Sequence, residues 1–136
     1  MRNETKSNYT QDITSYDYLL HPFTKDLDRM YEEIGEWRRL IDDYNLAHGG
    51  STRVIFTEAY TTIENTMKYY FDSDGKPRSH FPFNFFLLTN LSADATARDF
   101  KDTIDTWLTN MPPGATPNWV VSITKLIFIS FSLRQP

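Results

Sequence analysis

Residues 53–70, RVIFTEAYTTIENTMKYY, contain the transition that decides the fold. Arg53 to Phe56 have strand-forming character and lead into Thr57 and Glu58, and a helical pattern follows directly. A carboxylate at the end of a buried strand is poorly placed for a hydrophobic core. It is well placed for chemistry if the fold is a barrel of alternating strands and helices, because such barrels have their active sites at the carboxyl ends of the strands. The alternative is a solvated glutamate, or one that caps the next helix.

A predicted helix precedes this strand and begins at Thr24. Its apolar side chains recur every three or four residues, so one face of the helix should be buried. These side chains are Leu27, Met30, Tyr31, Ile34, Trp37, Ile41 and Tyr44. Asp26 and Asp28 lie at the positive end of the helix dipole. The helix should end at residues 48–50 (HGG), because glycine adopts the left-handed turn that ends helices at little cost.

A second helix is predicted within a few residues of the strand. Thr61 and Glu64 have the spacing of a capping box at its start. The apolar side chains along one of its faces are Ile63, Met67 and Tyr70. Residues 71–79 (FDSDGKPRS) are rich in turn formers and predict a loop, in which Asp72 and Asp74 are solvated.

Residues 80–88 (HFPFNFFLL) are the second strand candidate, and Pro82 within it cannot donate a ladder hydrogen bond. Ser92 or Asp94 can cap a third helix, which residues 112–114 (PPG) end. The apolar side chains at helical spacing in this third helix are Ala97, Phe100, Ile104, Trp107 and Met111.

Residues 118–121 (NWVV) begin a third predicted strand. The order helix, strand, helix, strand, helix, strand is the alternation that produces a parallel sheet, open or closed. The predicted fold class is therefore α/β, and no repeat or linker divides the chain. Trp37 and Trp107 lie on amphipathic helix faces and are expected in the core.

The composition narrows the class of ligand. A net charge of −4 without a basic stripe argues against nucleic acid or an anionic membrane surface as the main partner. Cysteine is absent, and His21, His48 and His80 are too scattered to form a metal-ligand motif, so we expect neither a metal nor a cofactor. We expect His21 and His80 to be structural. The aromatic content of 15% suits sugar-like ligands as well as a core.

The two ends of the chain are predicted to lie outside the regular elements. The polar opening, residues 1–23, reads as a loop and lacks the apolar core of a secretory signal. Asn3, Asn8 and Asn90 stand in glycosylation sequons, which have meaning only in a secreted chain. Residues 123–133 (ITKLIFISFSL) are too few to span a bilayer as a helix and predict an exposed strand.

Three segments resemble the insect maltase branch of glycoside hydrolase family 13, within the α-amylase superfamily of (β/α)8 barrels. They are residues 16–44 (YDYLLHPFTKDLDRMYEEIGEWRRLIDDY), 52–70 (TRVIFTEAYTTIENTMKYY) and 80–120 (HFPFNFFLLTNLSADATARDFKDTIDTWLTNMPPGATPNWV). The resemblance implies an incomplete (β/α)8 TIM barrel, from about helix 4 to the start of strand 7. Residues 1–121 would form this partial catalytic domain, and residues 122–136 would be a divergent tail that is not native to the family.

The resemblance also implies an activity. Family members release glucose from maltose, sucrose and short oligosaccharides with retention of configuration, using an aspartate nucleophile and a glutamic acid/base at the end of the fifth strand. Glu58 in the motif TEAY takes the second role, in which it protonates the departing oxygen and then deprotonates water. Tyr60 and Phe83-Asn84-Phe85 would face the pocket mouth, and ordinary core packing is the alternative for the aromatic residues.

Two catalytic regions of the family are not found in the sequence. The nucleophile motif Gly-Phe-Arg-x-Asp should lie before Arg2, and Asn-His-Asp should follow residues 118–120, where the chain instead reads VSITKLIFISFSLRQP. A general acid without its partner carboxylate cannot form the glycosyl intermediate. We therefore expect this chain alone to be inactive, and we interpret the tail as the translation of unspliced or misassembled sequence.

Three function classes remain open. The first is a segment of a secreted or membrane-anchored α-glucosidase, with any anchor in parts other than these. The second is a non-catalytic relative, similar to the ancillary subunits of amino-acid transporters, which would not need a strand-end acid. The third is a surface-binding or scaffold protein without enzymology. The motif TEAY, with Glu58, favours the first class.

Overall fold

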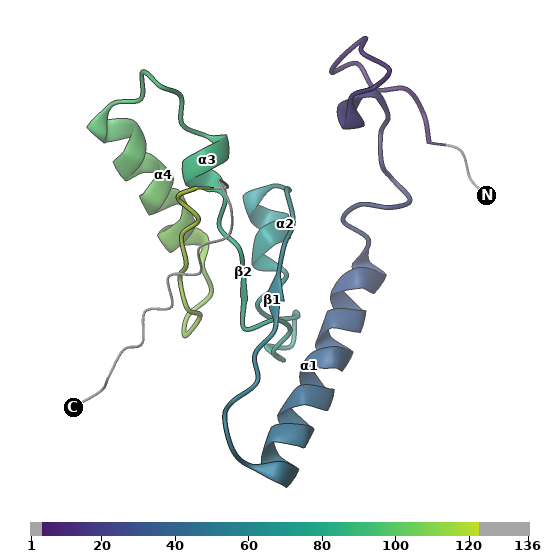
Figure 1. The fold of residues 1–136 in the computed structure, drawn as a ribbon, viewed down its shortest axis with the longest axis vertical. Coiled ribbons are helices and arrows are strands. Elements are labelled where there is room, and N and C mark those ends of the chain that lie inside the picture. The colour runs from purple at the N-terminus through teal and green to yellow at the C-terminus, as the bar shows by residue number, and fades with distance from the viewer. Residues whose placement is uncertain (1–3, 123–136) are drawn as a thin grey trace.

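A computed structural model describes residues 4–122 of the 136-residue chain, and the predicted strand of the tail lies outside them. In chain order the elements are η1 (Tyr16–Tyr18), α1 (Asp28–His48), β1 (Phe56–Thr57), α2 (Ile63–Met67), β2 (Phe81–Pro82), α3 (Phe86–Thr89) and α4 (Ala97–Asn110), as Figure 1 shows. Within the described residues β1 and β2 form a two-stranded parallel sheet, so the predicted α/β class is confirmed.

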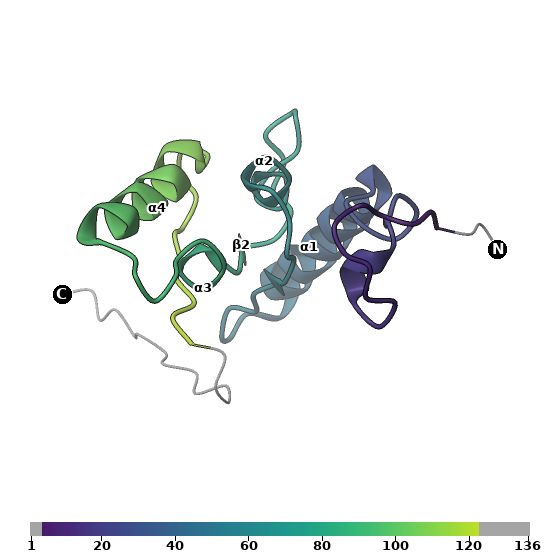
Figure 2. The same ribbon diagram turned by 90° about the horizontal axis from the view of Figure 1, so that it is seen from above.

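The elements form an open row. Viewed from above in Figure 2, α1 lies on one side of the strands and α4 on the other, with α2 and α3 between them. The opening segment extends beyond α1 and away from the sheet, as Figure 1 also shows. Two strands cannot close a sheet, so both of its edges are left without a neighbouring strand in the described part of the chain.

Helix α1 ends where the sequence predicts but begins later. Gly49 has a φ of 60°, and its N–H donates to the Asn45 carbonyl at 2.9 Å, which confirms the glycine stop after His48. The helix starts at Asp28 rather than at Thr24. Residues 21–25 instead close a turn of their own, in which the Lys25 N–H donates to the His21 carbonyl at 3.0 Å.

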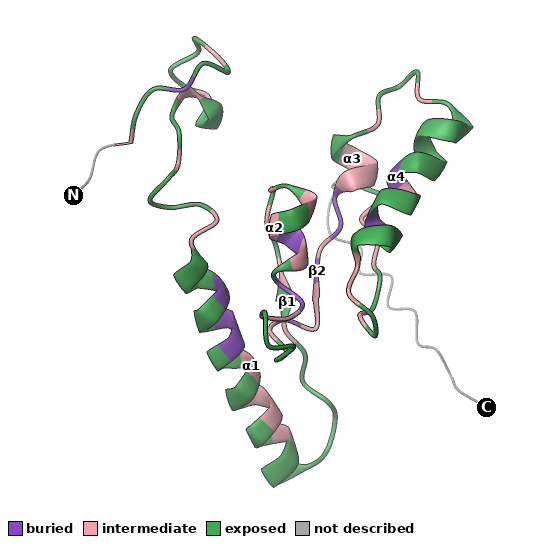
Figure 3. Ribbon diagram, turned by 180° about the vertical axis from the view of Figure 1, so that it is seen from behind, coloured by how far each residue is buried: buried purple, intermediate pink, exposed green. Residues whose placement is uncertain are grey.

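The buried stripe of α1 is narrower than predicted. Tyr31, Ile34 and Gly35 are buried and face the sheet and α2, whereas the opposite side of the helix is exposed, as Figure 3 shows. Trp37 is 56% exposed, so the expectation that it packs in the core is wrong. The physical reason is coverage: the described elements pack against α1 from one side, and the exposure of the Trp37 side chain shows that they do not cover it.

Strand β1 is displaced from its predicted position. It comprises Phe56–Thr57 rather than residues 53–56, and Val54 is exposed. The pairing with β2 decides this position, because Phe56 lies opposite Phe81 and Thr57 opposite Pro82. Pro82 has no N–H to donate, and the N–H of the next residue, Phe83, donates to the Thr57 carbonyl at 2.8 Å instead.

The predicted strand over residues 80–88 is correct only at its start. Residues 83–85 are irregular and the chain then turns into the short helix α3, so the strand assignment is wrong from residue 83 onward. The side-chain oxygen Oδ1 of Asn84 accepts a hydrogen bond from the Phe86 N–H at 3.0 Å, which favours a turn over continued strand. The aromatic residues of this segment are typical of strands, and the sequence prediction followed them rather than the turn-forming tendency of Asn84.

Residues 118–121 form no strand in the described part of the chain, contrary to the prediction. One backbone hydrogen bond connects this segment to the end of β2, from the Val120 N–H to the Asn84 carbonyl at 3.0 Å. The Asn118 side chain supplies the remaining contacts, because it accepts from the Asn84 N–H and donates to the Pro82 carbonyl. A side chain therefore occupies the place that a strand backbone would take.

Both predicted helix caps are shifted along the sequence. Helix α2 is capped by Thr62 rather than Thr61, with the Asn65 N–H donating to the Thr62 hydroxyl at 3.4 Å. Helix α4 is capped by Thr96 rather than by Ser92 or Asp94. Thr96 and Asp99 form a full capping box, in which the Thr96 N–H donates to the Asp99 carboxylate at 2.7 Å.

Two small clusters form the core. Tyr31, Ile34 and Tyr69 pack together with Ala59, between α1 and the segment around α2. Trp107 of α4 is 0% exposed, which confirms its predicted burial, and its ring lies 5.6 Å from that of Phe86, edge to face. Among the described residues every helix is too short or too polar to cross a bilayer.

Candidate active site

Glu58 directly follows strand β1, and its carboxylate is exposed. It forms no hydrogen bond or ion pair with another described residue. The backbone on each side is held, because the Thr57 carbonyl accepts from the Phe83 N–H and Ala59 packs against the core cluster. Thr62 caps α2, so the alternative that Glu58 caps this helix does not apply. The Glu58 carboxylate therefore has no partner among the described residues, whereas the backbone on both sides of it is fixed by contacts.

Aromatic side chains line the same side of the sheet. In extended chain, residues two apart point the same way, which places Phe56 and Glu58 on one face. The Phe56 ring stacks on Phe81 with centroids 4.4 Å apart, and Tyr60 stacks on Phe85 at 4.5 Å. Phe83 lies 6.0 Å from both Phe56 and Phe85. Together these rings form a connected aromatic cluster.

Three of the four predicted binding residues come together. Tyr60, Phe83 and Phe85 line one open hollow of about 600 Å³. Residues from the segment just before α1 and from the loop before α2 share its wall, among them Asp26 and Thr61. Phe85 is buried by its neighbours, whereas Tyr60 is 51% exposed and accessible to a ligand. The volume lies within the range of small-molecule sites.

Asn84, the fourth predicted binding residue, is placed differently. Its side chain is 0% exposed and does not line the hollow. It connects the end of β2 to the start of α3, and its backbone is bonded to Asn118 and Val120. The side-chain nitrogen Nδ2 is buried without a hydrogen-bond partner, which is costly for a polar donor.

For Asp26 the sequence predicted only a position at the positive end of a helix dipole, and not a place in the wall of the hollow. Its carboxylate accepts hydrogen bonds from the hydroxyls of Thr61, at 2.7 Å, and Tyr31, at 3.3 Å. Burial, reinforced by the charge of Asp26, raises the pKa of Tyr31 well above its ordinary value. The backbone of Asp26 has a φ of 56°. Glycine is the usual residue in this conformation, and asparagine and aspartate adopt it only occasionally, so an aspartate in the sequence does not predict it.

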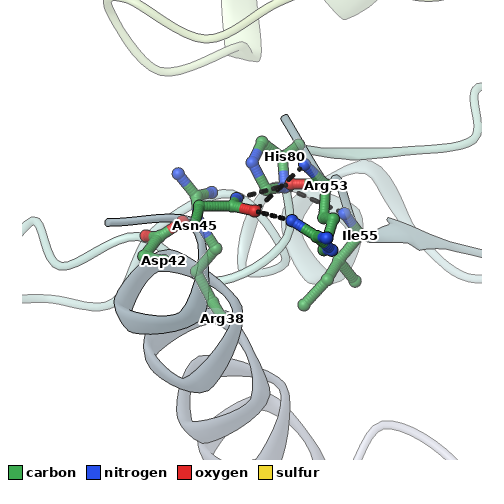
Figure 4. Close-up of polar contacts among 6 residues, drawn as sticks. All are labelled: Arg38, Asp42, Asn45, Arg53, Ile55 and His80. Carbon is green, nitrogen blue, oxygen red and sulfur yellow. Dashed lines mark hydrogen bonds and ion pairs between the residues drawn. The ribbon is translucent and has the colours of Figure 1, made fainter. Parts of the chain in front are cut away.

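A polar cluster connects α1 to the starts of both strands, as Figure 4 shows. The Asn45 side chain accepts from the Arg53 N–H and guanidinium and donates to the Arg53 carbonyl at 3.2 Å. The His80 ring nitrogen Nδ1 accepts from the Ile55 N–H at 2.9 Å, and the His80 N–H donates to the Ile55 carbonyl at 3.0 Å. Burial, together with the charge of Arg38, lowers the pKa of His80.

The two histidines expected to be structural are hydrogen-bonded, which confirms that prediction. Besides His80, His21 contacts the Glu4 carboxylate at 2.7 Å and the Tyr16 carbonyl at 2.8 Å. Within residues 4–122 no group of three metal-ligating side chains could hold a metal ion. Of the sequon asparagines, Asn8 and Asn90 are exposed, and Asn3 lies outside the described residues.

Comparison with known proteins identifies the relatives of this segment. No protein-family model matches the chain. It is 44% identical over 121 residues to Maltase 1 of Drosophila virilis, a match that covers 89% of the chain. It is 39% identical over 112 residues, or 82% of the chain, to Salivary alpha-glucosidase of Anopheles gambiae. The chain is similar to one segment of insect maltases.

The match covers only a small part of each relative. The chain spans 19% of the length of the Drosophila virilis relative and 18% of the Anopheles gambiae relative. A human protein named Amino acid transporter heavy chain SLC3A1 is 32% identical over 128 residues, covering 89% of the chain and 18% of that relative. Proteins with different names thus share this maltase-like segment.

Proposed function

We propose that the chain is part of the catalytic barrel of a retaining α-glucosidase of glycoside hydrolase family 13. Its substrates are maltose, sucrose and short oligosaccharides with a terminal α-1,4-linked glucose. In this proposal residues 1–121 supply the barrel from about helix 4 to the start of strand 7, and residues 122–136 are a divergent tail. The similarity to insect proteins named maltase and alpha-glucosidase supports the assignment.

The observation that favours catalysis most directly is the free carboxylate of Glu58 at the end of β1, beside a parallel neighbouring strand. Glu58 acts first as a general acid, donating a proton to the glycosidic oxygen as the bond to the sugar breaks. It then acts as a general base, taking a proton from the water that attacks the glycosyl intermediate. Exposure allows both transfers, because the carboxylate has no competing partner among the described residues.

The nucleophile belongs to another part of the parent protein. A retaining glycosidase needs its two carboxyl groups about 5 to 5.5 Å apart. Asp72 and Asp74 do not serve, because they lie in the turn after α2, where the Asp72 carboxylate accepts from the N–H groups of Asp74 and Lys76. The chain alone is therefore inactive in this proposal.

In this proposal the sugar binds in the hollow that Tyr60, Phe83 and Phe85 line, although Glu58 itself is not among the residues of its wall. Tyr60, Phe83 and Phe85 offer aromatic faces to the apolar C–H surface of a glucose ring. Asn84, which the sequence places in the binding group, supports these side chains from behind through its contacts with Phe86 and Asn118. Direct contact between Asn84 and the sugar would require its Nδ2 to be uncovered.

The parent protein acts outside the cell, either secreted or on the extracellular face of a membrane. The relatives named as salivary alpha-glucosidases support this, and exposed Asn8 and Asn90 are its glycosylation sites, with Asn3 a third candidate. The partner is a small oligosaccharide. The chemistry assigned to Glu58 needs no cofactor, and the net charge of −4 argues against nucleic acid as the main partner.

The test is the substitution Glu58→Gln in the full-length parent protein. An amide keeps the shape but cannot donate the proton, so kcat on maltose should fall about 100- to 10,000-fold. A nitrophenyl glucoside should suffer less, because its leaving group needs little protonation. Glu36→Gln, an exposed glutamate on α1, is the matched control and should retain wild-type kcat. Unchanged kcat in Glu58→Gln would remove this residue from the mechanism.

A second candidate is a non-catalytic role like that implied by the name of the human heavy chain, to which the segment is 32% identical. This candidate predicts that the full-length parent releases no glucose from maltose and that Glu58→Gln changes nothing. Assay of the wild-type parent separates the two candidates before any variant is made.

A further inference from the structure

Asp26 has a backbone conformation that non-glycine residues adopt uncommonly. Its φ of 56° lies in the left-handed region, and among the described residues it is the one non-glycine residue there. Such conformations persist when the surroundings determine them, and they concentrate at functional sites. Asp26 also lies in the wall of the hollow that Tyr60, Phe83 and Phe85 line.

The contacts of the Asp26 carboxylate explain why it is held there. One oxygen accepts the Thr61 hydroxyl at 2.7 Å, and the other accepts the Tyr31 hydroxyl at 3.3 Å. Tyr31 is 1% exposed within the core cluster, so this donor is fixed. Thr61 is 35 residues away in sequence, in the loop that leaves β1. The carboxylate therefore joins the segment before α1, and Tyr31 within α1, to the loop that follows Glu58.

Glu58 lies between fixed points. On one side the Thr57 carbonyl is bonded to Phe83, and on the other Ala59 packs against the core and Thr61 is bonded to Asp26. We infer that Asp26 is a positioning residue for Glu58, which it orients by holding Thr61 and thereby the backbone of residues 58–61. This inference rests on the proposed function of Glu58 as the acid/base.

The chemistry explains why a carboxylate occupies this position. An ionised carboxylate can only accept, so both hydroxyls must donate to it, and bonds to a charged acceptor are stronger than neutral ones. Asparagine tolerates the left-handed conformation but offers a single acceptor oxygen. The substitution Asp26→Asn therefore changes the hydrogen bonds while it preserves the backbone.

The experiment measures maltose hydrolysis by the full-length parent protein and by Asp26→Asn, Thr61→Val and the double variant. Misplacement of a catalytic group by about 1 Å costs up to about 100-fold, so kcat should fall about 10- to 100-fold in each single variant. KM should change less than about twofold, and the pH profile of kcat/KM should shift on the limb that Glu58 governs. The double variant should be no worse than the single ones, because both remove one interaction.

Thr61→Ser and Asp43→Asn are the controls. Thr61→Ser keeps the hydroxyl and should restore kcat, and Asp43 is an exposed aspartate on α1 whose substitution should leave the kinetics unchanged. Unchanged kcat in Asp26→Asn, additive losses in the double variant, or lower thermal stability with an unshifted pH profile would each overturn the positioning role. If Glu58→Gln itself keeps its kcat, the proposed function fails and this inference with it, whereas an inactive Glu58→Gln beside an unaffected Asp26→Asn overturns the inference alone.

Discussion

At the residue scale, His80 shows how one hydrogen bond fixes a protonation state. The Ile55 N–H can only donate, so the ring nitrogen Nδ1 that it contacts must be unprotonated. A proton at Nδ1 would replace this attraction by a clash of two N–H groups. The neighbouring charges come from α1, where Arg38 opposes protonation and Asp42 favours it. Burial is the largest influence, and the pKa of His80 is lowered as a result.

This geometry predicts a pH dependence of stability in the full-length parent. The folded pKa of His80 lies below its unfolded value of about 6.5. The contribution of His80 to stability is therefore fully present above pH 6.5 and is lost as the pH falls through the folded pKa. The melting temperature measured between pH 5 and 8 should decline less steeply toward acid in His80→Asn, because the Asn oxygen accepts without titrating.

His48→Asn is the control for this measurement. His48 is exposed at the end of α1 and stacks on Tyr44, so its substitution should leave the slope of melting temperature against pH nearly unchanged. Identical slopes in wild type and His80→Asn would show that His80 does not govern the acid response.

At the element scale, the ends of helices depend on single side chains. Helix α4 is capped by Thr96, whose hydroxyl accepts from the Asp99 N–H while the Asp99 carboxylate accepts from the Thr96 N–H. These hydrogen bonds lower the pKa of Asp99. The same helix buries Trp107 against Phe86 near its other end.

Replacement of the cap gives an element-scale prediction. Thr96→Ala removes the acceptor for the first turn of α4 and should lower the free energy of unfolding of the full-length parent by about 1 kcal/mol. Chemical denaturation of purified protein measures this change. Asp94→Ala is the matched control, because Asp94 is exposed and, contrary to the sequence prediction, does not cap the helix. A loss in Asp94→Ala equal to that in Thr96→Ala would contradict the cap assignment.

At the scale of the whole molecule, much apolar surface lacks a covering neighbour within residues 4–122. Phe56, Tyr60 and Leu46 are exposed, and so are Tyr9 and Ile13 of the opening segment. The two-stranded sheet has two unpaired edges, which a closed barrel would not have. Isolated two-stranded sheets are marginally stable at best in water. These features are typical of a polypeptide that needs further chain to complete its core.

We expect the 136-residue chain expressed alone to be poorly soluble and to release no glucose from maltose above a vector control. Exposed apolar side chains and unpaired strand edges favour association and so lower the solubility. Hydrolysis is not expected because the proposed acid/base, Glu58, lacks the partner nucleophile that a retaining glycosidase requires. Analytical sedimentation and a glucose assay measure the two parts. A soluble monomer that melts cooperatively and hydrolyses maltose would mean that a carboxylate within these residues replaces the nucleophile.

Local signals in the sequence determined much of the fold. The apolar period of α1 and the glycine stop after His48 follow from the sequence of α1, and the burial of Trp107 follows from the apolar spacing within α4. The place of Glu58 at the end of a strand was also predictable, because the strand and the following helix adjoin it in sequence. Its role as acid/base stays a prediction.

Only the tertiary structure decided the features that depend on distant partners. The position of β1 follows from pairing with β2, and the burial of Asn84 follows from Asn118, which lies 34 residues away. The left-handed conformation of Asp26 has its explanation in Thr61, across 35 residues. Periodicity and capping signals report interactions within a few residues. Contacts across 25 residues or more leave no such pattern, so folding alone reveals which side chains they join.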